Sequence, residues 1–164
     1  MPDSLLAFAA TPAESAVAID AVAIDRLPGV IAGLAPVAAA WLGSTGFSGA
    51  AGEVALLPDG AGGIASVLFG LGKGSHAPSL LPGKLPGMLP AGTYRFGQGF
   101  DDLPLASVAW ALGAYRFTRY RKASGEPRRL VLPPTVDTAD VVRIADGVAL
   151  ARDLVNTGAN DLGP

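Results

Sequence analysis

Glycine and proline divide this chain into short segments, and this punctuation limits the possible architectures more than any other feature. The 164 residues include 22 glycines and 14 prolines, which implies many turns and loops. This share falls short of a low-complexity composition and shows no collagen period. Because half of the residues are nevertheless apolar, we expect one compact domain with a substantial core.

Residues 27–52 contain no charged side chain, so this stretch is long enough to cross a bilayer. Pro28, Pro36 and repeated glycines interrupt it, and its apolar residues are mostly alanines. We therefore expect a buried helix with flanking loops rather than a membrane span. The start of the chain lacks a basic region before its apolar run, which argues against a secretory signal peptide.

The reactive side chains exclude several kinds of site. Cysteine is absent, which excludes disulfides, thiolate metal sites and a cysteine nucleophile, and which is consistent with an intracellular location. The single histidine, His76, excludes sites that need two imidazoles and is interpreted as a loop residue. The acids are scattered, and their one adjacent pair, Asp101–Asp102, is expected to support the amino end of a helix.

Segments with strand and helix character succeed one another along the chain. A Pro-Asp-Gly turn after Leu57 predicts a hairpin, and residues 70–92 are expected to form a long surface loop with a short helical turn near residues 79–81. The pattern predicts an α/β sandwich, in which helices flank a mixed β-sheet. The expected strands are residues 15–24, 53–57, 64–70, 93–96 and 128–132, and the expected helices are residues 34–44, 104–122 and 139–155.

Each expected helix has an apolar face and terminal residues suited to its ends. Gly46 is suited to end the first helix, and Pro104 fits the first turn of the second. Gly113 predicts close packing against a neighbour, and Asp137 or Thr138 is expected to cap the last helix. The expected faces comprise Leu34, Val37, Ala38, Trp41 and Leu42; Leu105, Val108, Ala109, Leu112 and Tyr115; and Val141, Ile144, Ala145, Val148 and Val155.

Residues 70–75, Gly-Leu-Gly-Lys-Gly-Ser, follow an expected strand and have some features of a phosphate-binding loop. Backbone amides in such a loop can converge on an anion. The pattern Gly-x4-Gly-Lys-Ser/Thr is not present, nor is Gly-x-Gly-x-x-Gly, so simple turn residues are favoured. Binding of a nucleotide diphosphate remains an alternative.

Half of the 12 basic residues lie between Arg116 and Arg129, interleaved with Tyr115, Phe117 and Tyr120. Such a cluster could bind nucleic acid, because arginines contact phosphates and aromatic rings stack on bases. The net charge of −2 favours a different interpretation, in which the aromatics enter the core and the arginines pair with acids.

The end of the chain carries the most specific resemblance. Arg-Asp-Leu-Val-Asn-Thr at residues 152–157 and Ala-Asn-Asp-Leu-Gly-Pro at 159–164 closely resemble the junction between the amino-terminal and catalytic domains of the leucyl (cytosol) aminopeptidase family. Gly158 stands where that family usually has proline, which loosens the junction. Asn156 and Asn160 are expected to connect the last helix to the next element. Residues 41–49, 52–54, 67–72, 85–94 and 110–117 are also similar to the family.

This resemblance implies an amino-terminal α/β domain with a macro-like sandwich fold over residues 1–136. Residues 137–164 would form a linker helix and the start of the junction to a catalytic domain that the chain lacks. That catalytic domain uses two divalent metals, zinc or manganese, to activate water for attack on the first peptide bond. Its Asn-Thr-Asp-Ala-Glu-Gly-Arg segment does not occur here, so no catalytic, cofactor-binding or metal-binding residue is assigned to the chain.

The resemblance therefore implies the non-catalytic domain of a cytoplasmic metallo-aminopeptidase, inactive by itself. Such a domain would support its catalytic domain and the assembly of a homo-hexamer that acts on peptides. Two alternatives come from other functional classes. One is a macro-like module that binds ADP-ribose through Gly70 to Ser75, and the other is a nucleic-acid-binding domain that uses Arg116 to Arg129.

Overall fold

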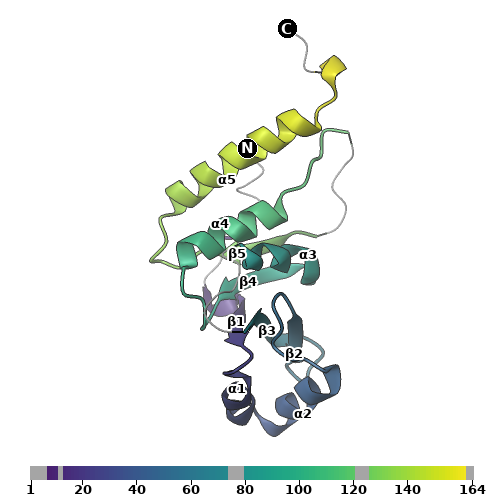
Figure 1. Cartoon of the computed structure of the whole chain (residues 1–164), viewed down its shortest axis with the longest axis vertical. Coiled ribbons are helices and arrows are strands. Elements are labelled where there is room, and N and C mark those ends of the chain that lie inside the picture. The colour runs from purple at the N-terminus through teal and green to yellow at the C-terminus, as the bar shows by residue number, and fades with distance from the viewer. Residues whose placement is uncertain (1–6, 11–12, 74–79, 121–125, 162–164) are drawn as a thin grey trace.

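A computed structural model describes residues 7–10, 13–73, 80–120 and 126–161. Helices lie on both sides of a five-stranded sheet, and the longest helix crosses one end of the molecule (Figure 1). The elements are β1 Val17–Ala23, α1 Leu27–Gly33, α2 Pro36–Thr45, β2 Val54–Pro58, β3 Ile64–Gly72, η3 Leu81–Lys84, α3 Leu85–Met88, β4 Gly92–Phe96, α4 Leu103–Ala114, β5 Arg128–Val131 and α5 Thr138–Asn156, with short 3₁₀ turns at Ala13–Ser15 and Ala159–Asp161.

The sheet is mixed, with the strand order β2-β3-β1-β4-β5. The pairs β1–β3, β1–β4 and β4–β5 are parallel, and β2–β3 is antiparallel. The predicted hairpin is confirmed: the Asp59 carboxylate closes its turn by accepting from the amides of Ala61 at 2.7 Å and Gly63 at 2.8 Å. The α/β class and the mixed sheet flanked by helices are likewise confirmed.

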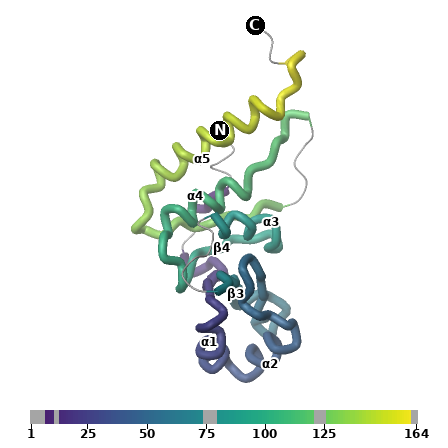
Figure 2. The backbone as a smooth tube through the Cα atoms, in the orientation of Figure 1, coloured from purple at the N-terminus to yellow at the C-terminus, as the bar shows by residue number. Residues whose placement is uncertain are grey.

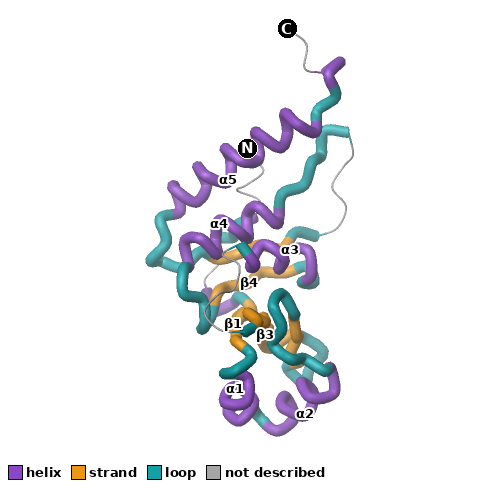
Figure 3. The backbone as a smooth tube through the Cα atoms, in the orientation of Figure 1, coloured by secondary structure: helices purple, strands orange, loops and turns teal. Residues whose placement is uncertain are grey.

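One face of the sheet packs against α3 and α4 through a core rich in aromatic residues (Figure 3). Trp110 of α4 is fully buried, with its ring centroid 6.0 Å from that of Tyr94 and 6.4 Å from that of Phe96. The Trp110 indole also donates a hydrogen bond to the carbonyl of Ala7, at 3.2 Å. This core therefore joins β4, α4 and the start of the chain.

Two glycines let the segment before β4 approach α4 closely. A Cβ on Gly113 would lie 1.8 Å from the carbonyl oxygen of Gly83, so the close packing predicted for Gly113 is confirmed. The prediction of a surface loop is wrong for residues 81–89, because η3 and α3 bury Leu81, Leu85 and Leu89 in the core. Their prolines occupy first-turn positions of short helices, where proline is tolerated, and so do not break the fold there.

On the opposite face of the sheet, α1 and α2 pack against side chains of β1, β2 and β3 (Figure 1). The predicted helix of residues 34–44 corresponds to α2, but α1 lies before it where a loop was expected. The expectation that this helix is buried is wrong, because most of both helices is solvent-exposed. Leu42 is buried as expected, but Val37 is 79% exposed and Trp41 47% exposed. Gly46 ends α2 with φ 71°, as predicted. Among the described residues, no helix has the length and apolarity needed to cross a membrane.

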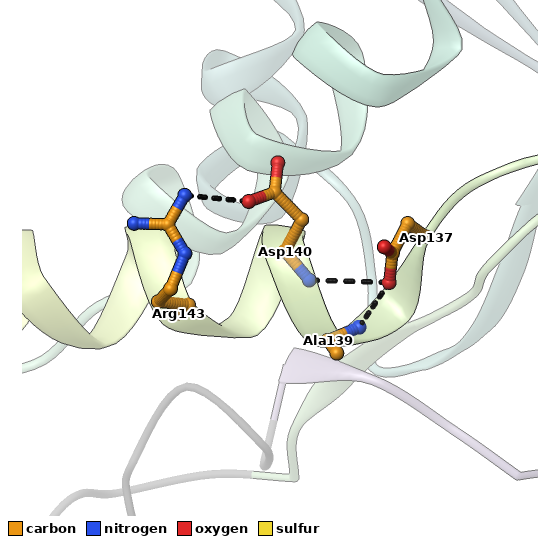
Figure 4. Close-up of polar contacts among 4 residues, drawn as sticks. All are labelled: Asp137, Ala139, Asp140 and Arg143. Carbon is orange, nitrogen blue, oxygen red and sulfur yellow. Dashed lines mark hydrogen bonds and ion pairs between the residues drawn. The ribbon is translucent and has the colours of Figure 1, made fainter.

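The last helix packs on the outer side of α4, so that α4 lies between α5 and the sheet (Figure 2). Its predicted cap is confirmed: the Asp137 carboxylate accepts from the amides of Ala139 at 2.9 Å and Asp140 at 3.3 Å (Figure 4). Asp140 also forms an exposed ion pair with Arg143 at 2.5 Å, one turn further along the helix.

The central helix is shorter than predicted. It ends at Ala114 rather than near residue 122, because Tyr115 adopts an extended conformation with φ −53° and ψ 135°. Residues 115–120 then leave α4 and run toward the carboxyl end of α5 (Figure 1). The segment that follows α4 therefore also lies beside the last helix.

Candidate functional site

The residues considered for catalysis or metal binding do not form such a site in the described part of the chain. Asp102 caps α4 by accepting from the amide of Leu105 at 2.8 Å, as predicted. The described residues contain no group of three or more His, Cys, Asp or Glu side chains able to hold a metal ion. The donor set of the described residues therefore does not fit a binuclear centre. His76 lies outside the described residues.

The described glycines of the expected phosphate loop serve a packing role. Gly70 and Gly72 belong to β3, and their amides donate to the carbonyls of Glu53 at 2.8 Å and Gly49 at 2.9 Å. A Cβ on Gly70 would lie 2.1 Å from the carbonyl oxygen of Ala50. These amides are therefore engaged with the loop before β2 and do not converge on an anion. Gly74 and Ser75 lie outside the described residues.

Tyr115 connects the end of α4 to the last turns of α5. Its hydroxyl donates to the Asp153 carboxylate at 2.6 Å and accepts from the Asn156 amide nitrogen at 3.4 Å. The Arg152 guanidinium lies 5.3 Å from the centroid of the Tyr115 ring and donates to the carbonyl of Leu112 at 2.7 Å. One aromatic side chain and one arginine thus fix the two helices against each other.

A second group of contacts holds the residues that follow α5. The Tyr120 hydroxyl accepts from the amide of Gly158 at 3.0 Å and donates to the Asp161 carboxylate. Arg119 donates to the Thr157 hydroxyl at 3.3 Å, and that hydroxyl bonds the carbonyl of Asp153 at 2.6 Å. We call the whole set the junction clamp; it consists of Tyr115, Arg119, Tyr120, Arg152, Asp153, Asn156, Thr157, Gly158 and Asp161.

The contacts of the basic cluster correct the expectation that its arginines pair with acids and its aromatics enter the core. The arginines Arg116 and Arg119 donate to backbone carbonyls and a hydroxyl rather than pairing with acids, and Tyr120 stays more than half exposed rather than entering the core. The contacts of Arg119 and Tyr120 join two parts of the chain 38 residues apart, which sequence spacing does not reveal. Arg121 and Lys122 lie outside the described residues.

The electrostatics of the clamp keep Tyr115 protonated. Burial raises the pKa of Tyr115 above its usual value, and the hydrogen bond to Asp153 raises it further, because ionisation would place two anions in contact. The hydroxyl therefore remains a donor throughout the neutral pH range. Asn156 takes part in this network, as expected for a residue at the end of α5, whereas Asn160 lies exposed in the turn that follows.

The side of α5 next to the clamp carries a shallow apolar hollow. Its lining residues are Gly147, Val148, Ala151, Arg152, Val155 and Asn156. The prediction that Val155 packs into the domain is wrong, because this side chain is 85% exposed. Leu150 and Leu154, spaced by four residues, extend the exposed apolar surface of the helix.

The family model and the solved structures that match this chain are all of aminopeptidases or related enzymes. Residues 17–133 match the family model of the M17 aminopeptidase N-terminal domain. The cytosol aminopeptidase from Coxiella burnetii is similar at 30% identity, with a TM-score of 0.84 over 94% of this chain and 34% of that one. A search of curated protein sequences found no match.

Two further structures share the fold at lower identity. The bottromycin maturation enzyme BotP, in a structure described as a complex with Mn, is 23% identical, with a TM-score of 0.64 over 92% of this chain and 34% of that one. A tomato leucine aminopeptidase is 20% identical, with a TM-score of 0.56 over 89% of this chain and 36% of that one. The chain thus spans about a third of the length of the structures it matches.

Proposed function

Because this chain belongs to the M17 aminopeptidase family as an N-terminal domain, we propose that it is the non-catalytic part of a metal-dependent leucyl aminopeptidase. Its role is to support the catalytic domain and the assembly of subunits. The parent enzyme removes amino-terminal residues from peptides in the cytoplasm and works as a homo-hexamer.

The observation that carries this proposal is the extent of the structural likeness. The Coxiella burnetii enzyme aligns over 94% of this chain, whereas this chain accounts for only 34% of that enzyme. The described residues also lack a metal-binding group. We therefore place the two divalent metals, manganese or zinc, and all catalytic side chains in the remaining two thirds of the parent enzyme. The structure described with Mn for BotP supports a metal of this kind.

We divide the chain into a domain of residues 1–136 and a linker of residues 137–164. The junction clamp gives this division a physical basis, because it fixes the direction in which the chain leaves α5. Two tyrosines and two arginines hold the last turn of the helix and residues 157–161 against the domain. A catalytic domain attached there would start from a defined position and orientation.

The test is a chimaera in which this chain replaces the corresponding third of the Coxiella burnetii enzyme. We expect the chimaera to hydrolyse a leucyl amide in the presence of manganese, and this chain alone to give no turnover. Tyr115→Phe combined with Asp153→Ala removes the central clamp contact and should lower the activity of the chimaera. Arg143→Ala, which changes only the exposed ion pair on α5, is the matched control and should leave it unchanged.

Two results would overturn the proposal. Turnover by this chain alone that is abolished by a chelator would contradict a non-catalytic role. A chimaera no more active than the catalytic part by itself would contradict the supporting role.

A further inference from the structure

The outer side of α5, which faces away from α4, changes character along the helix. Asp140, Arg143, Gly147, Leu150 and Leu154 recur at intervals of three or four residues, which places them along one side of the helix. In the first half this side carries the exposed ion pair between Asp140 and Arg143 (Figure 4). In the second half it carries Leu150 and Leu154, which are 62% and 53% exposed. One side of a single helix is therefore charged at its start and apolar at its end.

The polar side chains of the second half of α5 point toward their own domain. Arg152 donates to the carbonyl of Leu112, and Asp153 accepts from the Tyr115 hydroxyl. A helix at the surface of a self-contained domain has the opposite arrangement, with its apolar residues against the domain and its polar residues in solvent. The second half of α5 thus satisfies its polar groups through the junction clamp, and its apolar side is the one that the described residues leave uncovered.

The exposed apolar residues form one continuous surface with a recess in it. Gly147, Ala151 and Val155 help to line the shallow hollow, and Leu150 and Leu154 project beside it. We call these five residues the outer stripe. Apolar residues scattered singly over a surface are ordinary, but residues gathered into one patch mark a contact with another structure.

The place of the outer stripe in the chain indicates which structure covers it. The match to the N-terminal domain model ends at residue 133, before α5 begins at Thr138. The alignment with the Coxiella burnetii enzyme covers 94% of the 164 residues, which is too much to leave out all 19 residues of α5. Part of this helix is therefore shared with the whole enzyme, although it lies beyond the matched N-terminal domain.

The outer stripe also lies next to the point where the proposed catalytic part would be attached. Val155 precedes by two residues the segment 157–161, which the junction clamp holds at the end of α5 (Figure 1). A short, oriented connection keeps the attached part at a high effective concentration beside the stripe. A separate molecule would have no such advantage and would lose translational and rotational freedom on binding.

We infer that the outer stripe packs against the catalytic part of the same polypeptide. This inference rests on the proposed function and names the surface through which the two parts touch. It divides α5 between them. The first half belongs to this domain through Val141 and Ala145, which are buried against it, whereas the second half lies between the domain and the catalytic part.

The first test measures how fast a new cysteine reacts with a maleimide, because the chain has no cysteine of its own. Leu154→Cys should react at least about ten-fold more slowly in the chimaera with the Coxiella burnetii catalytic part than in this chain alone, because a covered thiol reacts only when the contact opens. Mass spectrometry of the peptide that carries residue 154 gives the rate. Arg143→Cys is the matched control on the same side of α5, since Arg143 is 73% exposed, and its rate should not change.

Three results of this test would overturn the inference. One is an equal rate for Leu154→Cys in the chain and in the chimaera. Another is equal protection of Arg143→Cys and Leu154→Cys, which would contradict the division of α5. The third is protection of Leu154→Cys in this chain alone as its concentration rises, which would assign the outer stripe to a second copy.

The second test cuts the chimaera at a protease site inserted after residue 164. We expect the two parts to stay together on gel filtration, and we expect Leu154→Lys to weaken their association at least about ten-fold, because it places a charge in the apolar contact. Arg143→Ala should leave the association unchanged. Lysine is a good helix former, so far-ultraviolet circular dichroism should show that α5 is retained in the Leu154→Lys variant. Parts that separate as readily without the substitution as with it would contradict the contact.

These outcomes can be told apart from a failure of the proposed function. An active chimaera in which Leu154→Cys reacts as fast as in the free chain would reject the outer stripe and leave the supporting role intact. A chimaera no more active than the catalytic part by itself, with Leu154→Cys protected, would reject the supporting role and keep the contact.

Discussion

The two faces of the sheet differ in what covers them and in what they carry. On one face, α4 buries Trp110 against Tyr94 and Phe96, and α5 packs on top of α4. On the other face, α1 and α2 cover a smaller and mostly aliphatic cluster that includes Leu42 and Leu68. The first face therefore carries a deep core, which α4 and then α5 cover. The second face carries only a thin layer of helices next to solvent.

This difference separates a rigid base for the junction clamp from a lightly covered face. The junction clamp needs a rigid base, and it is built on α4, whose position is fixed by the aromatic core and by the contact between Gly113 and Gly83. The charge-free surface of α2 lies on the thin layer, where few buried side chains constrain its sequence. Substitutions matched across the two faces test this separation.

The largest effect on stability is expected from truncating Trp110 and Leu42, the large buried side chains of α4 and α2. Trp110→Ala should lower the free energy of unfolding by about 3–5 kcal/mol, because it empties a fully buried site among aromatic rings. Leu42→Ala should cost about 2–3 kcal/mol, near the low end for leucine, because the exposed α2 can move inward. Urea denaturation of both variants at one protein concentration measures the difference. An equal or larger loss for Leu42→Ala would contradict a deeper core on the α4 side.

A smaller effect is expected from adding one methyl group to a helical glycine. Gly113→Ala should destabilise the domain by about 1–3 kcal/mol, because the new Cβ would meet the Gly83 carbonyl. Gly147→Ala on α5 is the matched control, since its Cβ would meet nothing within 4 Å, and it should stabilise by up to about 1 kcal/mol. Thermal unfolding of the two variants checks the opposite signs. A neutral Gly113→Ala would show that α4 and η3 can separate without cost.

The smallest expected effect is a loss of stability in acid, and it is confined to the face of the sheet that α1 and α2 cover. Burial raises the pKa of Glu53, but hydrogen bonds from Ser48, Ala50 and Gly49 outweigh it, so that the pKa lies below its usual value of 4.5. Because the folded pKa is depressed, the stabilisation from Glu53 is present above pH 4.5 and is lost as the pH falls through the folded pKa. The loop of residues 48–53 should therefore loosen in acid before the rest of the domain.

An NMR titration with acid tests this expectation, because each of the two tryptophans reports on one face of the sheet. The indole NMR signal of Trp41, on α2, should shift as the pH falls from 6 to 3, while that of Trp110 should stay constant. Glu53→Gln, which cannot ionise, should remove most of the Trp41 shift. A Trp41 signal that titrates identically in the Glu53→Gln variant would assign the change to another group.

Local signals in the sequence predicted the elements whose causes are themselves local. The β2–β3 hairpin follows from its Pro-Asp-Gly turn, and the start of α5 follows from Asp137, whose side chain bonds amides only two and three residues away. The close approach at Gly113 was also predictable, because a glycine inside an apolar helix needs a packing reason. Its partner Gly83 was not, because nothing in the spacing of the two residues links them.

The errors fall where distant contacts decide the structure. The end of α4 was placed too late because residues 115–120 have no helix breaker, and the structure instead turns Tyr115 away to bond Asp153 of α5. Residues 81–89 were expected at the surface because prolines and glycines hide a helical period. Burial of Leu81, Leu85 and Leu89 against α4 overrides that composition.

By itself, the sequence determined the α/β class, the order of most elements, one end of each of α2, α4 and α5, and the resemblance to a leucyl aminopeptidase junction. These depend on turn chemistry, apolar periodicity and short motifs, which act over a few residues. Only the tertiary structure decided which residues form the junction clamp and that α2 is exposed with Trp41 bound to Leu56. Those features join residues 15 to 41 positions apart, and such pairings are set by how α5 packs on α4 and α2 on β2.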